Sequence, residues 1–268
     1  MKRFNKMPSC KICYFSGTGN TLWSAKKIAE IIGPQCELVS IGVIMSELEN
    51  TKIDNRIILE ADAVILLFPA YAYGLPAAVR NFVKNAELRT SYTAAIVTYG
   101  TSPGGALAQI KRLLHRKKIT VSWYGRIPSV ENYTALFGPQ KQKTINKRIE
   151  MQQKATKETA DRILNRDTNS VFGFRPLSAF ISMLFYIGIK VFYKWYKVTG
   201  DCDGCETCKK VCPVSAIVMN QGKPEFTKKC EHCQACIQWC PRKAILFGRF
   251  RAGTRQYHHP EIGLTDLT

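Results

Sequence analysis

A duplicated cysteine motif near the C-terminal end restricts the structure of this 268-residue chain more than any other segment. The segment CDGCETCKKVCPVSAI at 202–217 matches CEHCQACIQWCPRKAI at 230–245 in four cysteines, a proline and an Ala-Ile pair. The two copies are offset by 28 residues, which indicates an internal duplication. Because no signal peptide is recognisable, we expect the eleven cysteines of the chain to include thiolate ligands rather than disulfides.

The spacing within each copy is C-x2-C-x2-C-x3-C-P. Three cysteines at this interval can wrap around one face of a cubane iron–sulfur cluster, and the fourth is better placed to reach a second cluster. Zinc sites usually pair two C-x2-C knuckles across a longer loop and lack the third cysteine. The spacing therefore favours clusters, with a zinc module as the alternative.

Residues 199–250 resemble the bacterial two-cluster ferredoxins, which are small α+β domains. The resemblance implies two 4Fe-4S clusters with crossed ligation. One cluster would be held by Cys202, Cys205, Cys208 and Cys240, and the other by Cys230, Cys233, Cys236 and Cys212. No chemistry is expected of the remaining cysteines, and an odd separation on a strand would turn the side chains of Cys10 and Cys13 to opposite faces. Cys36 is interpreted in the same way, as a small core or surface residue.

The first 165 residues alternate between strand-like and helix-like segments. This alternation is typical of a parallel sheet with helices on both faces. We predict strands at 11–15, 37–41, 63–68, 94–99 and 119–124, with helices at 21–32, 76–86, 105–116 and 141–164.

A loop rich in glycine and hydroxyl groups, FSGTGNT at 15–21, joins the first predicted strand to the first helix. Small polar groups at a helix N-terminus suit an anion. A mononucleotide P-loop would need a lysine after the second glycine, and a dinucleotide loop would need a third glycine where Leu22 stands. A loop that wraps one phosphate monoester remains, formed by Ser16, Gly17, Thr18, Gly19, Asn20 and Thr21.

This loop resembles the FMN-phosphate loop of flavodoxins, and two later loops support the resemblance. The segment PAYAYGLP at 69–76 offers tyrosines for flavin stacking, and TYGTSPGG at 98–105 offers backbone groups to the isoalloxazine edge. Over residues 10–165 the resemblance implies bound FMN and an α/β flavodoxin-like, doubly wound parallel sheet of order 2-1-3-4-5; an empty scaffold of this fold is the alternative. The loop residues expected at FMN are Pro69, Ala70, Tyr71, Ala72, Tyr73, Gly74, Thr98, Tyr99, Gly100, Gly104 and Gly105.

The whole chain thus resembles the flavodoxin–ferredoxin fusion proteins of anaerobes. We expect an FMN domain at 1–165, a linker and amphipathic helix at 166–198, a ferredoxin domain at 199–250 and a tail at 251–268. The resemblance implies electron transfer between FMN, two clusters and outside redox proteins, without catalytic side chains. An FMN-dependent reductase of a small substrate such as a quinone is the alternative. The tail segment RQYHHP at 255–260 departs from the motif of such fusions, so His258 and His259 are expected to be exposed or packed on the ferredoxin domain.

The stretch 177–197 combines apolar residues with flanking lysines, and its longest uncharged run of 13 residues is too short for the roughly 20 that span a bilayer. It is interpreted as a helix connecting the domains, or as an interfacial helix on an anionic membrane. The formal charge of +19 falls to about +13 once the cofactors are included. Acidic redox proteins or an anionic membrane would suit this excess, and no nucleic-acid motif accompanies it. We therefore expect a cytoplasmic protein, with or without membrane contact.

The charges near the predicted flavin loops are also one-sided. No Asp or Glu occurs from Leu88 to Val130, whereas this segment contains seven Arg or Lys residues. Flavodoxins, the family that this domain resembles, surround FMN with acidic residues that disfavour the fully reduced anionic flavin. We therefore expect full reduction of the flavin at a less negative potential than in acidic flavodoxins.

Overall fold

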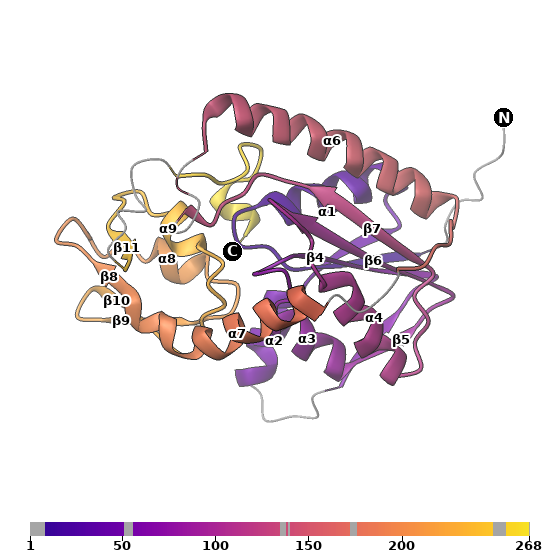
Figure 1. The fold of residues 1–268 in the computed structure, drawn as a ribbon, viewed down its shortest axis with the longest axis horizontal. Coiled ribbons are helices and arrows are strands. Elements are labelled where there is room, and N and C mark those ends of the chain that lie inside the picture. The colour runs from indigo at the N-terminus through magenta and orange to yellow at the C-terminus, as the bar shows by residue number, and fades with distance from the viewer. Residues whose placement is uncertain are drawn as a thin grey trace.

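The computed structural model describes residues 9–50, 56–134, 138, 140–171, 176–248 and 256–267. Its centre is a five-stranded parallel sheet with the order β2-β1-β4-β6-β7 (Figure 1). Counted along the chain, this is the order 2-1-3-4-5, so the predicted flavodoxin-like, doubly wound α/β fold is confirmed. The strands are β1 (Cys10–Tyr14), β2 (Cys36–Ser40), β4 (Ala63–Pro69), β6 (Tyr92–Tyr99) and β7 (Trp123–Pro128).

Helices bury both faces of this sheet. The core on one face contains side chains of α2 (Ile41–Asn50), α3 (Ala77–Asn85) and α4 (Ala106–Arg116). The core on the other face contains side chains of α1 (Asn20–Ile32) and α6 (Gln142–Leu164). The central strands are therefore apolar on both sides, as the run AVILLF in β4 illustrates.

The fifth strand lies four residues later than predicted, at 123–128 instead of 119–124. Ile119 and Val121 produced the apolar pattern, but they pack against the core from the connection before β7. Position 125 in β7 needs glycine, because a Cβ atom there would come within 2.4 Å of the ring of Trp123. Helix α2 and a parallel pair of β3 (Ile57–Glu60) and β5 (Ala86–Arg89) were not predicted.

The predicted helix at 177–197 is shorter than expected. Helix α7 spans Pro176–Phe192, and a 3-10 turn (Tyr193–Trp195) leads from it into β8 (Tyr196–Val198). The inner side of α7 packs against the loop before α3, where the hydroxyl of Tyr186 donates a 2.6 Å hydrogen bond to the carbonyl of Leu75. Within the described ranges, no helix is long and apolar enough to cross a membrane.

The C-terminal part contains two antiparallel strand pairs and two single-turn helices. Strand β8 pairs with β11 (Ile245–Phe247), and β9 (Ile217–Asn220) pairs with β10 (Lys223–Phe226). The short helices α8 (Thr207–Lys210) and α9 (Ala235–Gln238) each carry the third cysteine of one motif. This small α+β domain lies against one end of the parallel sheet (Figure 1).

Candidate functional site

A cavity of about 860 Å³ lies at the carboxyl ends of β1, β4, β6 and β7, where open α/β sheets bind ligands. The C-terminal domain and α7 supply its opposite wall. The structure thus brings three loops together that are distant in the sequence. Of the predicted flavin-binding residues, those that line the cavity are Ser16, Gly17, Thr18, Asn20, Thr21, Pro69, Ala70, Tyr71, Ala72, Tyr73, Thr98, Tyr99 and Gly100.

The other four predicted residues are glycines that shape the loops without lining the cavity. Gly74 packs against α7, and the N–H group of Gly105 donates a 2.8 Å hydrogen bond to the carbonyl of Tyr73. Gly19 and Gly104 have φ angles of +89° and +53°, which disfavour a side chain. Their contribution to the site is therefore conformational.

The glycine-rich loop begins α1 in a way that suits a phosphate group. The residue before α1 is Gly19, which has no side chain to occupy the free N–H groups of the first turn. Thr18 accepts a hydrogen bond at Oγ1 from Asn132, and the hydroxyls of Thr21 and Thr98 lie 2.7 Å apart. These residues fit the FMN phosphate, which would lie among small donors at a helix N-terminus.

The side chain of Asn20, which lines the cavity, also joins parts of the protein that are distant in the sequence. Its Nδ2 donates a 3.2 Å hydrogen bond to the carbonyl of Val130, and its Oδ1 accepts a 2.7 Å hydrogen bond from the hydroxyl of Tyr257. Both polar atoms of the side chain are therefore bonded within the protein. Asn20 fixes the loop to the end of β7 and to the tail.

Other cavity-lining residues were not foreseen from the sequence. One group, Ser129 to Tyr133, follows β7 and includes Glu131. A second group is aromatic, with Phe185 and Phe192 from α7 and Phe247 from β11. Charged and ring nitrogen groups come from Lys194, Lys197 and His232.

His232 lies within the aromatic wall of the cavity. Its ring is 5.1 Å from that of Phe247 and 5.8 Å from that of Phe192, centroid to centroid. Burial lowers the pKa of His232 to about 4, so the imidazole is neutral at pH 7. Its Nε2 is buried without a hydrogen-bond partner in the described structure, which makes this atom available to a ligand in the cavity.

The eight motif cysteines border two small cavities in the C-terminal domain. No group of three or more His, Cys, Asp or Glu side chains in the described part of the chain is placed to hold a metal ion. Four thiols that line one small cavity suit a group such as a cubane cluster. The first cavity is lined by Cys202, Cys205, Cys208 and Cys240, and the second by Cys212, Cys230, Cys233 and Cys236. These are the two crossed sets that the resemblance implies.

Backbone N–H groups point at the cysteine sulfurs. The amide of Ala216 donates to Sγ of Cys212 at 3.2 Å, and that of Ala244 donates to Sγ of Cys240 at 3.3 Å. Burial, with a smaller contribution from the neighbouring Cys240, raises the pKa of Cys208 to about 11. Anionic sulfurs in this setting need a cationic group to stabilise them, which iron would supply.

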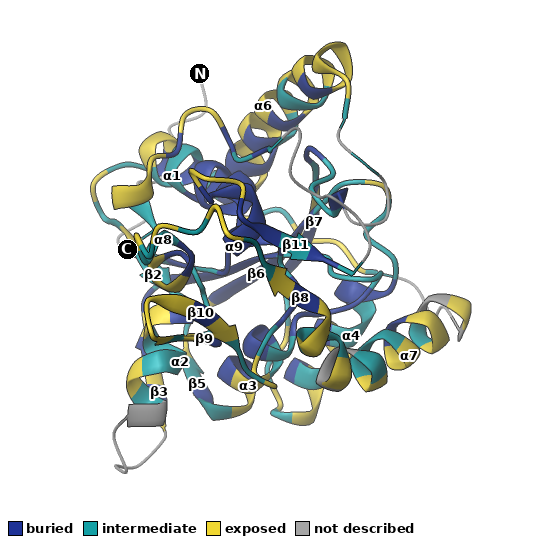
Figure 2. Ribbon diagram, turned by 90° about the vertical axis from the view of Figure 1, so that its left-hand side faces the viewer, coloured by how far each residue is buried: buried dark blue, intermediate teal, exposed yellow. Residues whose placement is uncertain are grey.

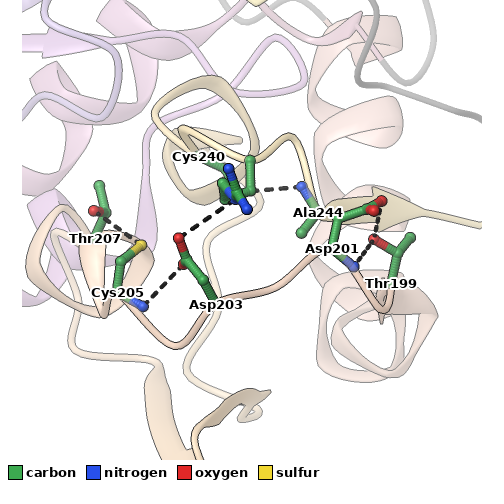
Figure 3. Close-up of polar contacts among 8 residues, drawn as sticks. Thr199, Asp201, Asp203, Cys205, Thr207, Cys240 and Ala244 are labelled. Atoms are coloured by element: carbon green, nitrogen blue, oxygen red, sulfur yellow. Dashed lines mark hydrogen bonds and ion pairs between the residues drawn. The ribbon is translucent and has the colours of Figure 1, made fainter.

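Asp203 connects the two motifs beside the first of these cavities, which we call the outer cysteine cavity (Figure 3). One carboxylate oxygen of Asp203 accepts a 3.2 Å hydrogen bond from the amide of Cys205. The other oxygen lies 3.4 Å from Nε of Arg242, which follows Cys240 by two residues. Hydrogen bonding with Cys205 lowers the pKa of Asp203, so this carboxylate is charged at neutral pH.

The second cavity, which we call the inner cysteine cavity, lies directly beside the glycine-rich loop. A Cβ atom built on Gly17 would be 3.0 Å from Cβ and 3.2 Å from Sγ of Cys233. Nε1 of Trp239 also donates a 3.2 Å hydrogen bond to the carbonyl of Gly17. Cys233 itself lines both the large cavity and the inner cysteine cavity. The two sites therefore share a wall.

The C-terminal tail passes between the two domains. His258 stacks on Trp239 with ring centroids 3.8 Å apart, so its expected packing on the ferredoxin-type domain is confirmed. His259 is fully buried and stacks on Trp23 of α1 at 4.8 Å, so neither exposure nor packing on the ferredoxin-type domain is right for it. The amide of His259 donates a 2.9 Å hydrogen bond to the carbonyl of Thr18. The tail thus covers the outside of the phosphate loop; Arg255 lies outside the described residues.

The three remaining cysteines lie in the flavodoxin-like domain. Cys10 and Cys13 are buried in the cores on opposite faces of the sheet, as the odd separation predicted. Cys36 is half-buried and pairs with Cys10 in the register of β1 and β2.

A comparison with protein-family models gives a match in the C-terminal part of the chain. Residues 194–247 match a family model described as a 4Fe-4S dicluster domain, and no curated protein matches the chain. Solved structures similar to the N-terminal part include the Trp repressor binding protein from Bacillus subtilis, with 14% identity over 57% of this chain and 97% of that chain, at a TM-score of 0.36. The flavodoxin from Streptococcus pneumonia TIGR4 shares 16% identity over 56% of this chain and 98% of that chain, at a TM-score of 0.32.

A third similar structure is the NAD(P)H:quinone oxidoreductase from Methanothermobacter marburgensis. It shares 10% identity over 62% of this chain and 100% of that chain, at a TM-score of 0.36. Similarities at this level imply nothing about ligand or activity. The strand order and the dicluster match together identify a flavodoxin-like fold followed by a ferredoxin-type 4Fe-4S domain.

Proposed function

We propose that this chain is an electron carrier that binds FMN and two 4Fe-4S clusters. The observation that carries the proposal is the wall shared by the large cavity and the inner cysteine cavity, which Cys233 lines on both sides. Bound FMN exchanges one or two electrons and each cluster exchanges one, so the protein would connect two-electron and one-electron carriers. The protein's own residues would hold these groups in sequence, with the Cys202 cluster outermost.

The residues around the large cavity support FMN as its ligand. The free N–H groups at the start of α1, together with Ser16 and Thr18, would bind the phosphate. Tyr71 and Tyr73 follow β4 and would contact the ring system. Backbone groups of residues 98–100 would meet the ring edge.

The phosphate assignment can be tested on protein purified without oxygen. FMN should bind more tightly than riboflavin, and Thr18→Ala should reduce that difference while iron content stays unchanged. Thr90→Ala, which removes a hydroxyl bonded to the carbonyl of Asp62, is the matched control. Equal affinity of the wild-type protein for FMN and riboflavin would contradict the phosphate loop.

The two-cluster proposal rests on the crossed sets of cysteines. Cys212→Ala should damage the inner cluster, held by Cys230, Cys233 and Cys236, although Cys212 belongs to the first motif. EPR together with iron and sulfide analysis would distinguish the clusters, and Cys36→Ala should leave both intact. Loss of the outer cluster alone in Cys212→Ala would show that the ligands do not cross, and a zinc content without sulfide would contradict clusters altogether.

The aromatic wall of the cavity favours a second candidate, a reductase of a small planar substrate such as a quinone. Phe185, Phe192, Trp195 and Phe247 line the cavity on the side away from the phosphate loop. Flat apolar substrates pack well against such rings. Turnover of quinones without turnover of ferredoxin would favour the reductase, and the reverse would favour the carrier. The net charge of +19 suits acidic protein partners in the latter case.

A further inference from the structure

Helix α7 presents an apolar surface that the described residues leave exposed. Eight of the fourteen exposed large apolar side chains in the described residues lie between positions 177 and 195. At 3.6 residues per turn, those on the helix fall within about 160° of its circumference. Figure 2 shows exposed residues along this helix at the edge of the molecule. We call these side chains the α7 face: Leu177, Phe180, Ile181, Met183, Leu184, Ile187, Val191 and Trp195.

The opposite side of α7 is fixed to the protein. Ser182 is buried against Gly74, and Tyr186 is bonded to Leu75 and lies under the guanidinium group of Arg80 at 5.1 Å. The inward side of the helix carries Ser182 and Tyr186 beside the cavity-lining Phe185 and Phe192. The helix thus has large apolar side chains on its outward side as well, which a helix that only covers a core in water would not need.

Cations lie on one side of the α7 face and beyond the C-terminal end of the helix. A groove of about 640 Å³ is lined by Met183 and Ile187 together with Lys228 and Lys229 of the ferredoxin-type domain. Beyond the C-terminal end of the helix, Lys194 and Lys197 are exposed. The carboxylate in the groove lining, Glu231, is buried against N–H groups of α3. The border of the face is therefore positively charged.

We propose that the α7 face lies in the surface of an anionic lipid bilayer, with α7 parallel to the membrane plane. Charge complementarity identifies the occupant, because an apolar stripe bordered by lysines matches acyl chains below anionic head groups. The helix is too short to span a bilayer, so it binds at the interface. Ile181 belongs to the α7 face and also lines the large cavity, so the cavity lies beside the membrane surface.

Co-sedimentation of the full-length holoprotein with lipid vesicles tests the proposal. The protein should bind vesicles that contain phosphatidylglycerol, bind pure phosphatidylcholine vesicles at least tenfold more weakly, and be released by salt. Leu184→Glu should abolish binding. Ile58→Glu on β3 should not, although it introduces the same charge at a side chain of similar exposure, 52% compared with 50%. Flavin and cluster absorbance in both variants would establish that they fold.

Three outcomes would overturn the proposal. The first is the absence of binding to phosphatidylglycerol vesicles at low salt. The second is equal loss of binding in Leu184→Glu and Ile58→Glu. The third is a concentration-dependent dimer in sedimentation velocity that Leu184→Glu dissociates, because the α7 face would then be covered by a second copy of the chain.

Discussion

The carboxylate of Glu231, the residue that follows Cys230, accepts hydrogen bonds from the amides of Ala77 and Ala78 at the start of α3. The distances are 3.1 Å and 2.5 Å. An acidic residue of the ferredoxin-type domain thus occupies the N-terminus of a helix in the flavodoxin-like domain, where the helix dipole favours negative charge. The inner cysteine cavity is thereby tied to the parallel sheet through one side chain.

Replacing Glu231 by glutamine should loosen this contact. The amide oxygen of glutamine can accept one N–H group, but its NH2 group would face the other donor. Loss of a buried hydrogen bond to a charged acceptor costs about 1–3 kcal/mol, so hydrogen exchange at Ala77 and Ala78 should become roughly 5- to 150-fold faster. Glu225→Gln, which alters an exposed hydrogen bond to Asn220 in the same domain, is the control. Unchanged exchange in Glu231→Gln would show that this contact does not hold the domains together.

The tail should contribute to flavin affinity through Tyr257. Its hydroxyl holds Asn20 by a 2.7 Å hydrogen bond, and Asn20 in turn fixes the phosphate loop to β7. Tyr257→Phe should raise the dissociation constant for FMN by about 5- to 10-fold, equivalent to about 1–1.4 kcal/mol, with iron content unchanged.

The matched control for Tyr257 is Tyr92→Phe. This variant also removes a buried tyrosine hydroxyl, in this case one that donates to the carbonyl of Asp167 far from the cavity. Flavin titration by fluorescence would compare the two variants. An equal change in both would mean that Tyr257 stabilises the fold in general and has no special effect on the loop.

Acidification should release the tail because of His259. Burial lowers the pKa of this histidine to about 4, from about 6.5 in an open chain. The detached tail therefore binds the proton more readily, and the packing of the tail weakens as the pH falls from about 6.5 towards 4. At pH 5 the loss is about 2 kcal/mol.

Hydrogen exchange of residues 256–262, corrected for the intrinsic effect of pH, would measure this release. His259→Phe keeps a ring against Trp23 and should remove the pH dependence. His115→Phe changes an exposed histidine on α4 and should retain it. A tail that is equally protected at pH 7 and pH 5 in the wild-type protein would contradict the prediction.

The sequence could predict those parts of the site in which local chemistry dictates the residue type. The loop at 15–21 needs glycines and small donors, and a cubane needs thiols at fixed spacing, so both patterns were recognisable. The parallel sheet followed from the alternation of elements, and the strand order was implied by the resemblance to flavodoxins. Local patterns of this kind can be recognised in the sequence without knowledge of tertiary contacts.

The opposite wall of the cavity could not be predicted in the same way. His232 occupies a variable position of the second cysteine motif and reaches the cavity only because the two domains pack together, whereas Glu131 lies beside the cavity within its own domain but belongs to no motif. The burial of His259 likewise depends on Trp23, more than 200 positions away in the sequence. The positions of such residues depend on packing between the domains. The periodicity of the local sequence does not indicate this packing.

One acidic residue, Glu131, lies among the charged side chains that line the predicted flavin cavity. The acid-free segment 88–130 ends one residue before Glu131, whose Oε2 accepts a 3.2 Å hydrogen bond from Thr101 in the predicted flavin loop. Lys194 and Lys197 line the same cavity and oppose this charge. Two lysines against one carboxylate still leave the cavity lining with a positive excess among its charged side chains.

We therefore predict that the second one-electron couple of the flavin is less negative than in acidic flavodoxins. One charge about 8 Å from the ring, at an effective dielectric constant of about 20, is worth about 2 kcal/mol, or about 90 mV for one electron. Glu131→Gln should raise this potential and Lys194→Gln should lower it, each by at most about 90 mV, because salt screens part of the effect. Anaerobic potentiometric titration of the holoprotein would measure both shifts. Shifts of the same sign in the two variants, or a wild-type couple well below both cluster potentials, would show that these charges do not set the potential.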